Sequence, residues 1–419
     1  MSEKEQNELP VSATAFTATQ PQVEERIFFG DVPEKPVIEA IDGIRFDFND
    51  GLRVSLPKGK VYRIRFVDLD TKSLVYDTIT PATESCVVAS RKKYYIKFRL
   101  VISDHETDKL LYSHDYDATG KEVMVRFPVH TLGDSIGWFS YVERFQKKLN
   151  CKLICVVSQW FADIVRKQYP DIEFITREEA GKRASYANYN IGLFELGDTN
   201  HQPIDHRYVG LHRVAAHILG VDDADIPPRF DLSATRKIKD KYVCIGVQST
   251  GLAKFWNNPI GWDTVVDFLK GQGYRVLCID KFPMCDKPGA NVRIPCGAED
   301  FTGDKPLQER IDLLKDADFF IGLSSGLSWL AWGCKVPVVM ISGFSNPLNE
   351  FKTPYRVINY NACNSCWNEF KKYDLQDFWN CPRLAGTERR FECTAMITPD
   401  HVIETIKPLL NSTRNRRLS

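Results

Sequence analysis

The chain has 419 residues, of which 43% are hydrophobic and 26% charged, a composition typical of a globular protein with two or three domains. Its 55 basic residues balance 55 acidic residues, which argues against a general nucleic-acid-binding or polyanion-binding surface. No apolar run is long enough to span a membrane, and the polar start of the chain lacks the apolar core of a secretory signal. These features predict a cytoplasmic protein whose cysteines are reduced.

The first part of the chain predicts an antiparallel β domain. Residues 1–36 are polar or irregular and are expected to be extended or disordered. Between 37 and 127, hydrophobic residues alternate with polar ones, which is the period of half-buried strands. Two alternating runs flank Asn49-Asp50-Gly51, a strong hairpin signal. Further runs lie at 61–69, 74–79, 94–102, 110–115 and 122–127. Six or more strands are enough for a small sandwich or an open barrel at 37–127.

The rest of the chain predicts two parallel α/β units. Apolar strands alternate with amphipathic helices over 128–228, and after the linker Pro227-Pro228-Arg229 the same alternation continues over 229–410. In the second unit the pattern predicts helices at 261–270, 307–315 and 326–333. A short basic tail follows at 411–419. The fold class is therefore α/β, with two units facing a cleft.

A glycine-flanked turn at the start of the first α/β unit is the strongest candidate site. Asp134 lies in this turn, between an apolar strand and an amphipathic helix. Gly133 and Gly137 allow a ligand or another backbone to approach closely. Thr131, together with the N–H groups of the following turn, including those of Leu132 and Gly133, can bind an anionic or polyhydroxylated group. Asp134 is then expected to lie within reach of the chemistry.

A second candidate follows the first strand of the second unit, where ligands of open parallel sheets bind. Here Gln248 and Thr250 are candidates to bind a base, a ribose or a phosphate, and Lys254 to neutralise a departing phosphate. Lys254 is equally consistent with an ordinary surface lysine. Asp280 ends the next apolar strand and is a candidate for the ribose hydroxyls, or alternatively part of a surface turn.

The third candidate is the start of the helix predicted at 326–333. Ser324 or Ser325 is suited to cap this helix, and Ser325 with the free N–H groups of Gly326 and Leu327, at the positive end of the helix dipole, predicts a diphosphate site. The alternative is a plain capped helix.

Four cysteines near the C-terminus predict a metal site. Cys363 and Cys366 form a Cys-x-x-Cys pair, and Cys381 and Cys393 follow within one short, helix-poor segment at 360–395. Four sulfur ligands leave no coordination position for water, so the predicted role is structural. A tetrahedral four-sulfur site suits zinc or iron, and the spacing does not choose between them.

Three histidines form a weaker cluster. His206, His212 and His217 lie in or before one predicted helix, but their spacing does not place them on a common face. We interpret them as packing or surface residues.

The chain resembles the bacterial autotransporter heptosyltransferases, cytoplasmic enzymes that glycosylate self-associating adhesins. The resemblance covers residues 37–410. It is carried by Thr131-Leu-Gly-Asp-Ser-Ile-Gly137, Ser249-Thr-Gly-Leu-Ala-Lys-Phe-Trp-Asn-Asn-Pro259, Ser324-Ser-Gly326 and the four cysteines. Compared with heptosyltransferases of the lipopolysaccharide core, which often have Asp-Thr-Gly and a histidine at the second helix start, this chain has Ser324-Ser-Gly and Trp329, and the departure favours the protein-modifying branch.

The resemblance implies a GT-B core of two Rossmann-like units, with the β domain added before it. It also implies ADP-heptose as donor, serines of an autotransporter passenger domain as acceptors, one iron per subunit in the four-cysteine finger, and a large ring-shaped homo-oligomer. In the mechanism that we expect, Asp134 is the general base, while Lys254 and the helix at Gly326 stabilise the departing ADP. This mechanism requires no divalent metal.

Two other functions remain open from the sequence. A lipopolysaccharide-core heptosyltransferase would share the fold but use a lipid-linked sugar as acceptor. A non-catalytic, metal-stabilised nucleotide-binding scaffold would bind ADP-sugars without turnover. Asp134 and Lys254, on facing units, favour an enzyme.

Overall fold

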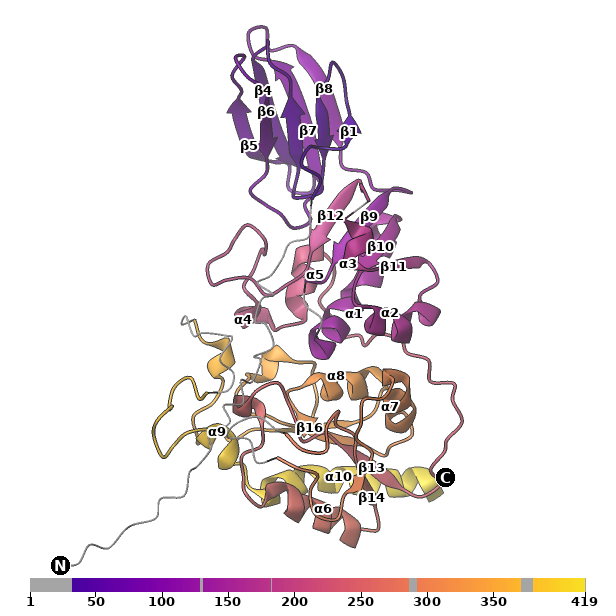
Figure 1. The fold of residues 1–419 in the computed structure, drawn as a ribbon. Coiled ribbons are helices and arrows are strands. Elements are labelled where there is room, and N and C mark those ends of the chain that lie inside the picture. Colours follow the sequence, from indigo (N-terminus) through magenta and orange to yellow (C-terminus); the bar gives the residue numbers. More distant parts are fainter. Residues whose placement is uncertain (1–31, 129–130, 182, 286–291, 371–379, 419) are drawn as a thin grey trace, which may run out of the picture.

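Three bodies follow one another along the chain in the computed structural model, which describes the backbone of residues 32–128, 131–181, 183–285, 292–370 and 380–418 and side chains only as far as 410. A β domain stands at one end, an α/β unit lies in the middle, and a second α/β unit closes the other end (Figure 1). No helix in the described ranges combines the length and the apolar character needed to cross a bilayer.

The β domain consists of two four-stranded antiparallel sheets, in the orders β1-β2-β3-β6 and β5-β4-β7-β8. Their strands are β1 Ile38–Glu39, β2 Arg45–Asp47, β3 Arg53–Leu56, β4 Tyr62–Asp68, β5 Ser73–Ile79, β6 Cys86–Ala89, β7 Phe98–Asp104 and β8 Leu110–Asp115. The predicted hairpin is confirmed: Phe46 pairs with Val54, and Gly51 in the connecting turn has φ 67°. This conformation favours glycine, which explains the turn signal in the sequence.

The middle unit contains one parallel sheet in the order β11-β10-β9-β12. Its strands are β9 Glu122–Arg126, β10 Lys152–Val156, β11 Ile172–Ile175 and β12 Ala187–Asn190, and its helical segments are α1 Leu132–Leu149, α2 Gln159–Val165, η1 Arg166–Gln168, α3 Arg177–Ala180, α4 His206–Val209 and α5 Arg213–Leu219.

One predicted strand belongs to a different sheet than expected. The run at 122–127 was assigned to the antiparallel domain, but β9 pairs in parallel with both β10 and β12. Val123, Met124 and Val125 are all buried, so both faces of this strand are covered. A consecutive apolar run of this kind is typical of a parallel strand with helices on both sides, whereas a strand with one wet face alternates.

The last unit contains a six-stranded parallel sheet in the order β15-β14-β13-β16-β17-β18. Its strands are β13 Tyr242–Ile245, β14 Arg275–Cys278, β15 Glu299–Asp300, β16 Phe320–Leu323, β17 Val338–Ile341 and β18 Arg356–Val357. Its helical segments are η2 Leu252–Lys254, α6 Gly261–Gly271, α7 Leu307–Leu314, α8 Gly326–Gly333, η3 Pro347–Asn349, η4 Cys366–Asn368, α9 Glu392–Ala395 and α10 Pro399–Leu418.

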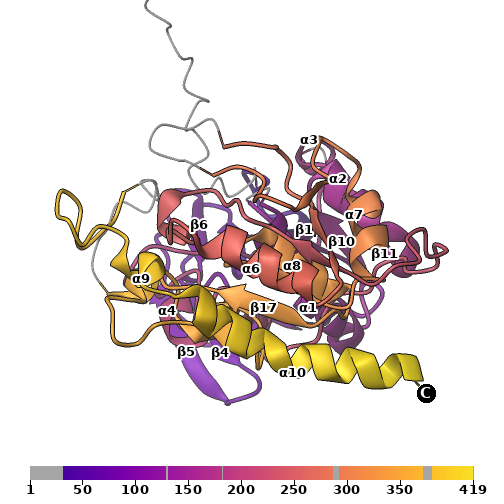
Figure 2. The ribbon, with the colours of Figure 1, turned by 90° about the horizontal axis from the view of Figure 1, so that it is seen from below.

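The three helices predicted in this unit are confirmed, and α8 has the predicted limits at both ends. Helix α10 lies beside α6 on one side of the sheet (Figure 2). Its backbone continues through 418, so residues 411–418 of the predicted basic tail belong to this helix, and residue 419 lies outside the described residues.

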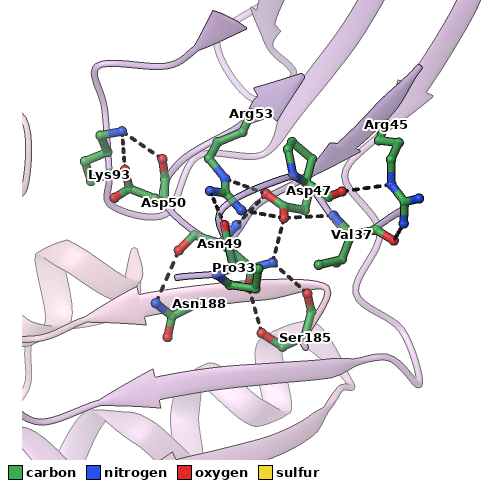
Figure 3. Close-up of polar contacts among 11 residues, drawn as sticks. Pro33, Val37, Arg45, Asp47, Asn49, Asp50, Arg53, Lys93, Ser185 and Asn188 are labelled. Carbon is green, nitrogen blue, oxygen red and sulfur yellow. Dashed lines mark hydrogen bonds and ion pairs between the residues drawn. The ribbon is translucent and has the colours of Figure 1, made fainter. Parts of the chain in front are cut away.

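A buried polar cluster joins the β domain to the middle unit (Figure 3). Asn49 donates through Nδ2 to the carbonyl of Ser185 at 2.8 Å, and the Ser185 hydroxyl donates to Asn49 Oδ1 at 2.7 Å. Asp47, which is fully buried, orients Asn49 by accepting from its Nδ2 at 2.9 Å. Arg53 neutralises the same carboxylate with two bonds, of 2.9 Å to Oδ1 and 2.7 Å to Oδ2. The hairpin therefore presents a rigid polar tip to β12.

We expect Asp47→Ala to lower the free energy of unfolding by about 3–5 kcal/mol, because removing one partner leaves Arg53 as an uncompensated buried charge. Denaturation in urea, followed by circular dichroism, measures this loss. The control is Asp77→Ala, which breaks the more exposed Arg63–Asp77 pair and should change the unfolding midpoint little. Equal losses in the two variants would contradict a special role for the junction.

Candidate active site

The site is organised by the contact between the first turns of α1 and α8, which belong to different α/β units and lie next to each other in Figure 1. A Cβ added to Gly133 would lie 2.9 Å from Cδ1 of Trp329, and one added to Gly326 would lie 2.8 Å from the Cβ of Leu132. Only glycine fits this close approach without a shift. The structure thus brings together the two helix starts that the sequence predicted separately.

Asp134 lies in the first turn of α1 and is half-buried. The hydroxyl of Thr131, the residue that precedes the helix, donates a hydrogen bond to its Oδ2. Burial raises the pKa of Asp134, while the Thr131 hydrogen bond and the positive charge of Lys254 act in the opposite direction. The site thus holds a carboxylate with an elevated pKa beside a cation, an arrangement often found in groups that transfer protons.

Lys254 ends η2, the short helical turn after β13, and its side chain is half-buried rather than extended into solvent. Burial lowers its pKa, while the negative charges of Asp134 and Glu350 raise it. Its Nζ lies 5.9 Å from the centroid of the Trp367 ring. The structure thus places the two predicted catalytic residues, which come from different units, within electrostatic reach of each other.

The start of α8 lacks the side-chain cap that its sequence suggested. Ser325 has the extended backbone of a cap residue, but its hydroxyl accepts no N–H from the first turn. Its Oγ is buried and has no hydrogen-bond partner in the described part of the chain. Buried polar atoms are normally paired, so an unpaired hydroxyl at a helix N-terminus is consistent with a place for a ligand such as a phosphate.

Glu350 lies next to this helix start and carried no motif in the sequence. It is 1% exposed and accepts hydrogen bonds from the Ser324 hydroxyl and from Asn349 Nδ2, the latter at 3.1 Å. Arg356 Nη1 lies 3.0 Å from its other oxygen. Burial works to raise the pKa of Glu350, but the charge of Arg356 and these hydrogen bonds outweigh it and lower the pKa. A full negative charge is therefore held within reach of Lys254.

The loop after β13 is shaped by Asp280, which is 2% exposed. Its carboxylate accepts the N–H groups of Val247, at 2.7 Å, and Gln248, at 3.2 Å. The Gln248 side chain donates to the carbonyl of Phe282 at 2.7 Å, while Thr250 is exposed. Burial raises the pKa of Asp280 to about 6, against the effect of these hydrogen bonds. The described contacts thus give Asp280 a local role in the loop, and its predicted ribose contact stays a prediction.

The four predicted metal ligands interact electrostatically, since Cys363, Cys381 and Cys393 all affect the pKa of Cys366. Cys366, Cys381 and Cys393 are buried, and Cys363 is half-buried. Burial, together with the neighbouring thiols, raises the pKa of Cys366 to about 12, against the opposite effect of Arg383.

Within the described residues, no group of three or more histidine, cysteine, aspartate or glutamate side chains is close enough to hold a metal ion. Part of the segment between the second and third cysteine, 371–379, lies outside those residues. The four thiols have the donor chemistry of a tetrahedral four-sulfur site. The metal finger therefore stays a prediction.

A second link between the two units was missed by the sequence. His212 is fully buried, as the packing interpretation predicted, and its Nε2 lies 2.7 Å from Asp225 Oδ1. Asp225 Oδ2 accepts the backbone N–H of Lys352 in the other unit at 3.0 Å. The His212 ring also packs at 5.2 Å against Trp329 of α8. These residues lie far apart in the sequence, so their spacing carried no signal.

Comparison with known proteins places the chain in a family. Residues 41–103 match the model of the N-terminal domain of the glycosyltransferase TibC, and residues 180–379 match glycosyltransferase family 9, the heptosyltransferases. The autotransporter heptosyltransferase Aah of Escherichia coli is 48% identical over 378 residues, which cover 90% of this chain and 96% of Aah. The chain belongs to the autotransporter heptosyltransferase family. It is therefore a glycosyltransferase, with the GT-B type of fold and an N-terminal antiparallel β domain.

Two further relatives bear on the function, one with a bound ADP-heptose and one described as inactive. The crystal structure of dodecameric, iron-containing TibC in complex with ADP-D-beta-D-heptose has 45% sequence identity and a TM-score of 0.88, and the match covers 92% of this chain and all of that one. The family also includes the inactive autotransporter heptosyltransferase BimC of Burkholderia thailandensis, 39% identical over 91% of this chain and 89% of BimC.

We expect Gly326→Ala to lower the rate of glycosyl transfer roughly 10- to 100-fold, because the added methyl group forces α1 and α8 apart and displaces groups aligned for the reaction. Steady-state kinetics measures the loss, and circular dichroism verifies the fold. Gly271→Ala is the control, since a Cβ there meets no atom within 4 Å. An unchanged rate in Gly326→Ala would show that the tight contact is dispensable.

Proposed function

We propose that the protein transfers heptose from ADP-heptose to serine hydroxyls in the passenger domain of an autotransporter adhesin. The observation that carries this proposal is the electrostatic interaction of Asp134 with Lys254 across the two units, together with the uncapped start of α8, which packs on the first turn of α1. Family membership supports heptose as the sugar, and the ADP-heptose complex of TibC supports the donor.

Asp134 serves as the general base. As the serine oxygen attacks the anomeric carbon of the heptose, its proton passes to the Asp134 carboxylate, and the bond from the anomeric carbon to the phosphate oxygen breaks. Attack opposite the departing group inverts the anomeric carbon. A positioned base typically contributes ~10²–10⁴-fold in rate. The raised pKa of Asp134 makes its carboxylate a stronger proton acceptor than an exposed aspartate.

Lys254 and the first turn of α8 stabilise the departing ADP. The electron pair of the broken bond leaves with the diphosphate, so negative charge develops there in the transition state. The N–H groups of Gly326 and Leu327, with the positive end of the helix dipole, and the Ser325 hydroxyl are suited to this charge. Burial lowers the pKa of Lys254, and the negative charges of Asp134 and Glu350 oppose this effect.

The remaining donor contacts come from the two predicted turns. Gln248 and Thr250 follow β13, at the edge of the sheet where ligands of parallel α/β folds bind. The start of α1 belongs to the other α/β unit. We assign its residues Thr131, Leu132 and Gly133 to the heptose and to the phosphate nearest to it.

We further propose that Cys363, Cys366, Cys381 and Cys393 hold one iron per subunit and that the subunits assemble into a large ring. The iron-containing, dodecameric TibC supports both parts of this proposal. A bound metal would supply a structural cross-link in a segment with little helix, and zinc remains the alternative occupant. The cytoplasmic location stays a prediction from the sequence.

The direct test is the intact mass of a purified passenger fragment after incubation with the protein and ADP-heptose. We expect a ladder of heptose-sized additions with the wild-type protein. Asp134→Asn should reduce the rate of addition by at least ~10²-fold, because its amide does not accept the serine proton. The variant should bind ADP as the wild type does, which isothermal titration calorimetry verifies.

Two results would change the proposal. Additions at the wild-type rate in Asp134→Asn, with an intact fold, would remove Asp134 as the base. ADP-sugar binding without any addition would favour a lipid-linked acceptor or a non-catalytic scaffold, a role made relevant by the inactive relative BimC. A fragment of lipopolysaccharide core, offered as acceptor, separates these two alternatives.

We expect a bell-shaped dependence of kcat/KM on pH. On the acidic side, kcat/KM falls because the Asp134 carboxylate becomes protonated. Because the pKa of Asp134 is raised, this fall occurs at a higher pH than that at which an exposed aspartate titrates. The alkaline limb is the loss of the Lys254 proton, and because its pKa is lowered this limb lies below the usual lysine value. Steady-state measurements of kcat/KM between pH 4 and about 11 define both limbs.

Lys254→Arg provides the control for this assignment. Arginine remains charged throughout the range, so the variant should lose the alkaline limb and keep the acidic one. An alkaline limb that is unchanged in Lys254→Arg would assign that limb to another group.

A further inference from the structure

The four-cysteine segment delivers an aromatic side chain to the active site. Trp367 directly follows Cys366 in η4. Its backbone N–H donates to the carbonyl of Phe344 at 3.0 Å, and the N–H of Ser365 donates to the carbonyl of Gly343 at 2.8 Å. These bonds fix the segment on the loop that follows β17, so the position of Trp367 is set by the backbone on both sides of Cys366.

The side chain of Trp367 is connected to two groups of the site. Its Nε1 donates to Asn349 Oδ1 at 2.9 Å, and Asn349 in turn donates to Glu350. The Nζ of Lys254 lies 5.9 Å from the centroid of its ring. A chain of contacts therefore leads from the cysteine segment to the cation and to the carboxylate that stabilises it.

We propose that Trp367 is a positioning residue through which the four-cysteine segment holds the Lys254 ammonium at the diphosphate of the donor. This inference rests on the proposed function of Lys254. It adds a role in donor binding to the structural role of the segment.

The physical reason lies in the freedom of a lysine side chain. Its ammonium sits on a flexible stem of four carbons, so a catalytic position must be enforced by neighbours. The face of an indole ring attracts a cation most strongly among the aromatic side chains, and the attraction grows where water is excluded. Trp367 is half-buried and itself fixed by the bond to Asn349, so its ring limits the positions open to the Lys254 ammonium.

The test is a double-mutant cycle measured as ADP affinity by isothermal titration calorimetry on the full-length protein. The four proteins are the wild type, Trp367→Leu, Lys254→Ala and the double variant. We expect Trp367→Leu to weaken ADP binding roughly 3- to 30-fold, the range of a cation–π contact. In the Lys254→Ala background the same change should have no further effect, because the cation on which Trp367 acts is gone.

Two further variants separate positioning from structure. Trp367→Phe keeps an aromatic face but loses the N–H bond to Asn349 that fixes the ring, so its ADP affinity should lie between those of Trp367→Leu and the wild type. Phe370 lies in the same segment as Trp367 and packs its exposed ring on Tyr208 of α4, so Phe370→Leu should have the ADP affinity of the wild type. Thermal unfolding of each variant verifies that the fold is kept.

The outcomes distinguish this inference from the proposed function. Trp367→Leu with wild-type affinity, or with an equal loss in both backgrounds, would overturn the positioning role while leaving Lys254 in place. Wild-type affinity in Lys254→Ala would overturn the proposed role of Lys254, and the inference would fall with it. Non-additive losses with partial rescue by Trp367→Phe support both.

Discussion

The glycine-lined contact between α1 and α8 is the constraint on which the rest of the site depends. Each helix directs the positive end of its dipole toward this contact, and two like ends repel each other. In α1 the first turn contains Asp134, whose carboxylate offsets the dipole, whereas the first turn of α8 contains no acidic residue. The start of α1 is therefore offset by a residue of its own, whereas the dipole at the start of α8 has no acidic side chain in its first turn to offset it. Asp134 and the start of α8 become neighbours because Gly133 and Gly326 have no side chain to separate the two helices.

Burial sets the electrostatic balance between Asp134 and Lys254. It disfavours the charged form of both Asp134 and Lys254, raising one pKa and lowering the other, while their proximity limits both shifts. Glu350 takes part in the same balance, since it is kept ionised by Arg356 although it is almost inaccessible. The cost of burying these charges is offset by their mutual attraction and by hydrogen bonds from Ser324 and Asn349. Such a network stores little stability, but it fixes positions, which is what a transferase requires of its charged groups.

The β domain and the cysteine segment are built onto this core in different ways. The β domain is attached through the polar tip of one hairpin, where Asp47 and Arg53 orient Asn49 against β12. The cysteine segment reaches the active site itself, through Trp367. The first attachment joins a domain to the core through polar contacts away from Asp134 and Lys254, whereas the second places its segment against Lys254 and Asn349.

The sequence by itself determined the local elements and the helix starts. The alternation around Gly51 predicted the hairpin, and the small residues before Gly326 predicted the start of α8, because periodicity and turn chemistry act over a few neighbouring residues. Only the tertiary structure determined to which sheet β9 belongs, because an apolar run can pair in parallel or antiparallel. Its partners β10 and β12 come later in the chain, and β9 pairs with both in parallel. It also decided the partners of Lys254, because Glu350 and Trp367 lie about a hundred residues further along the chain and form no motif with it. A contact between distant residues leaves no spacing to read, and so the chemistry of this site became visible only once the two units were packed together.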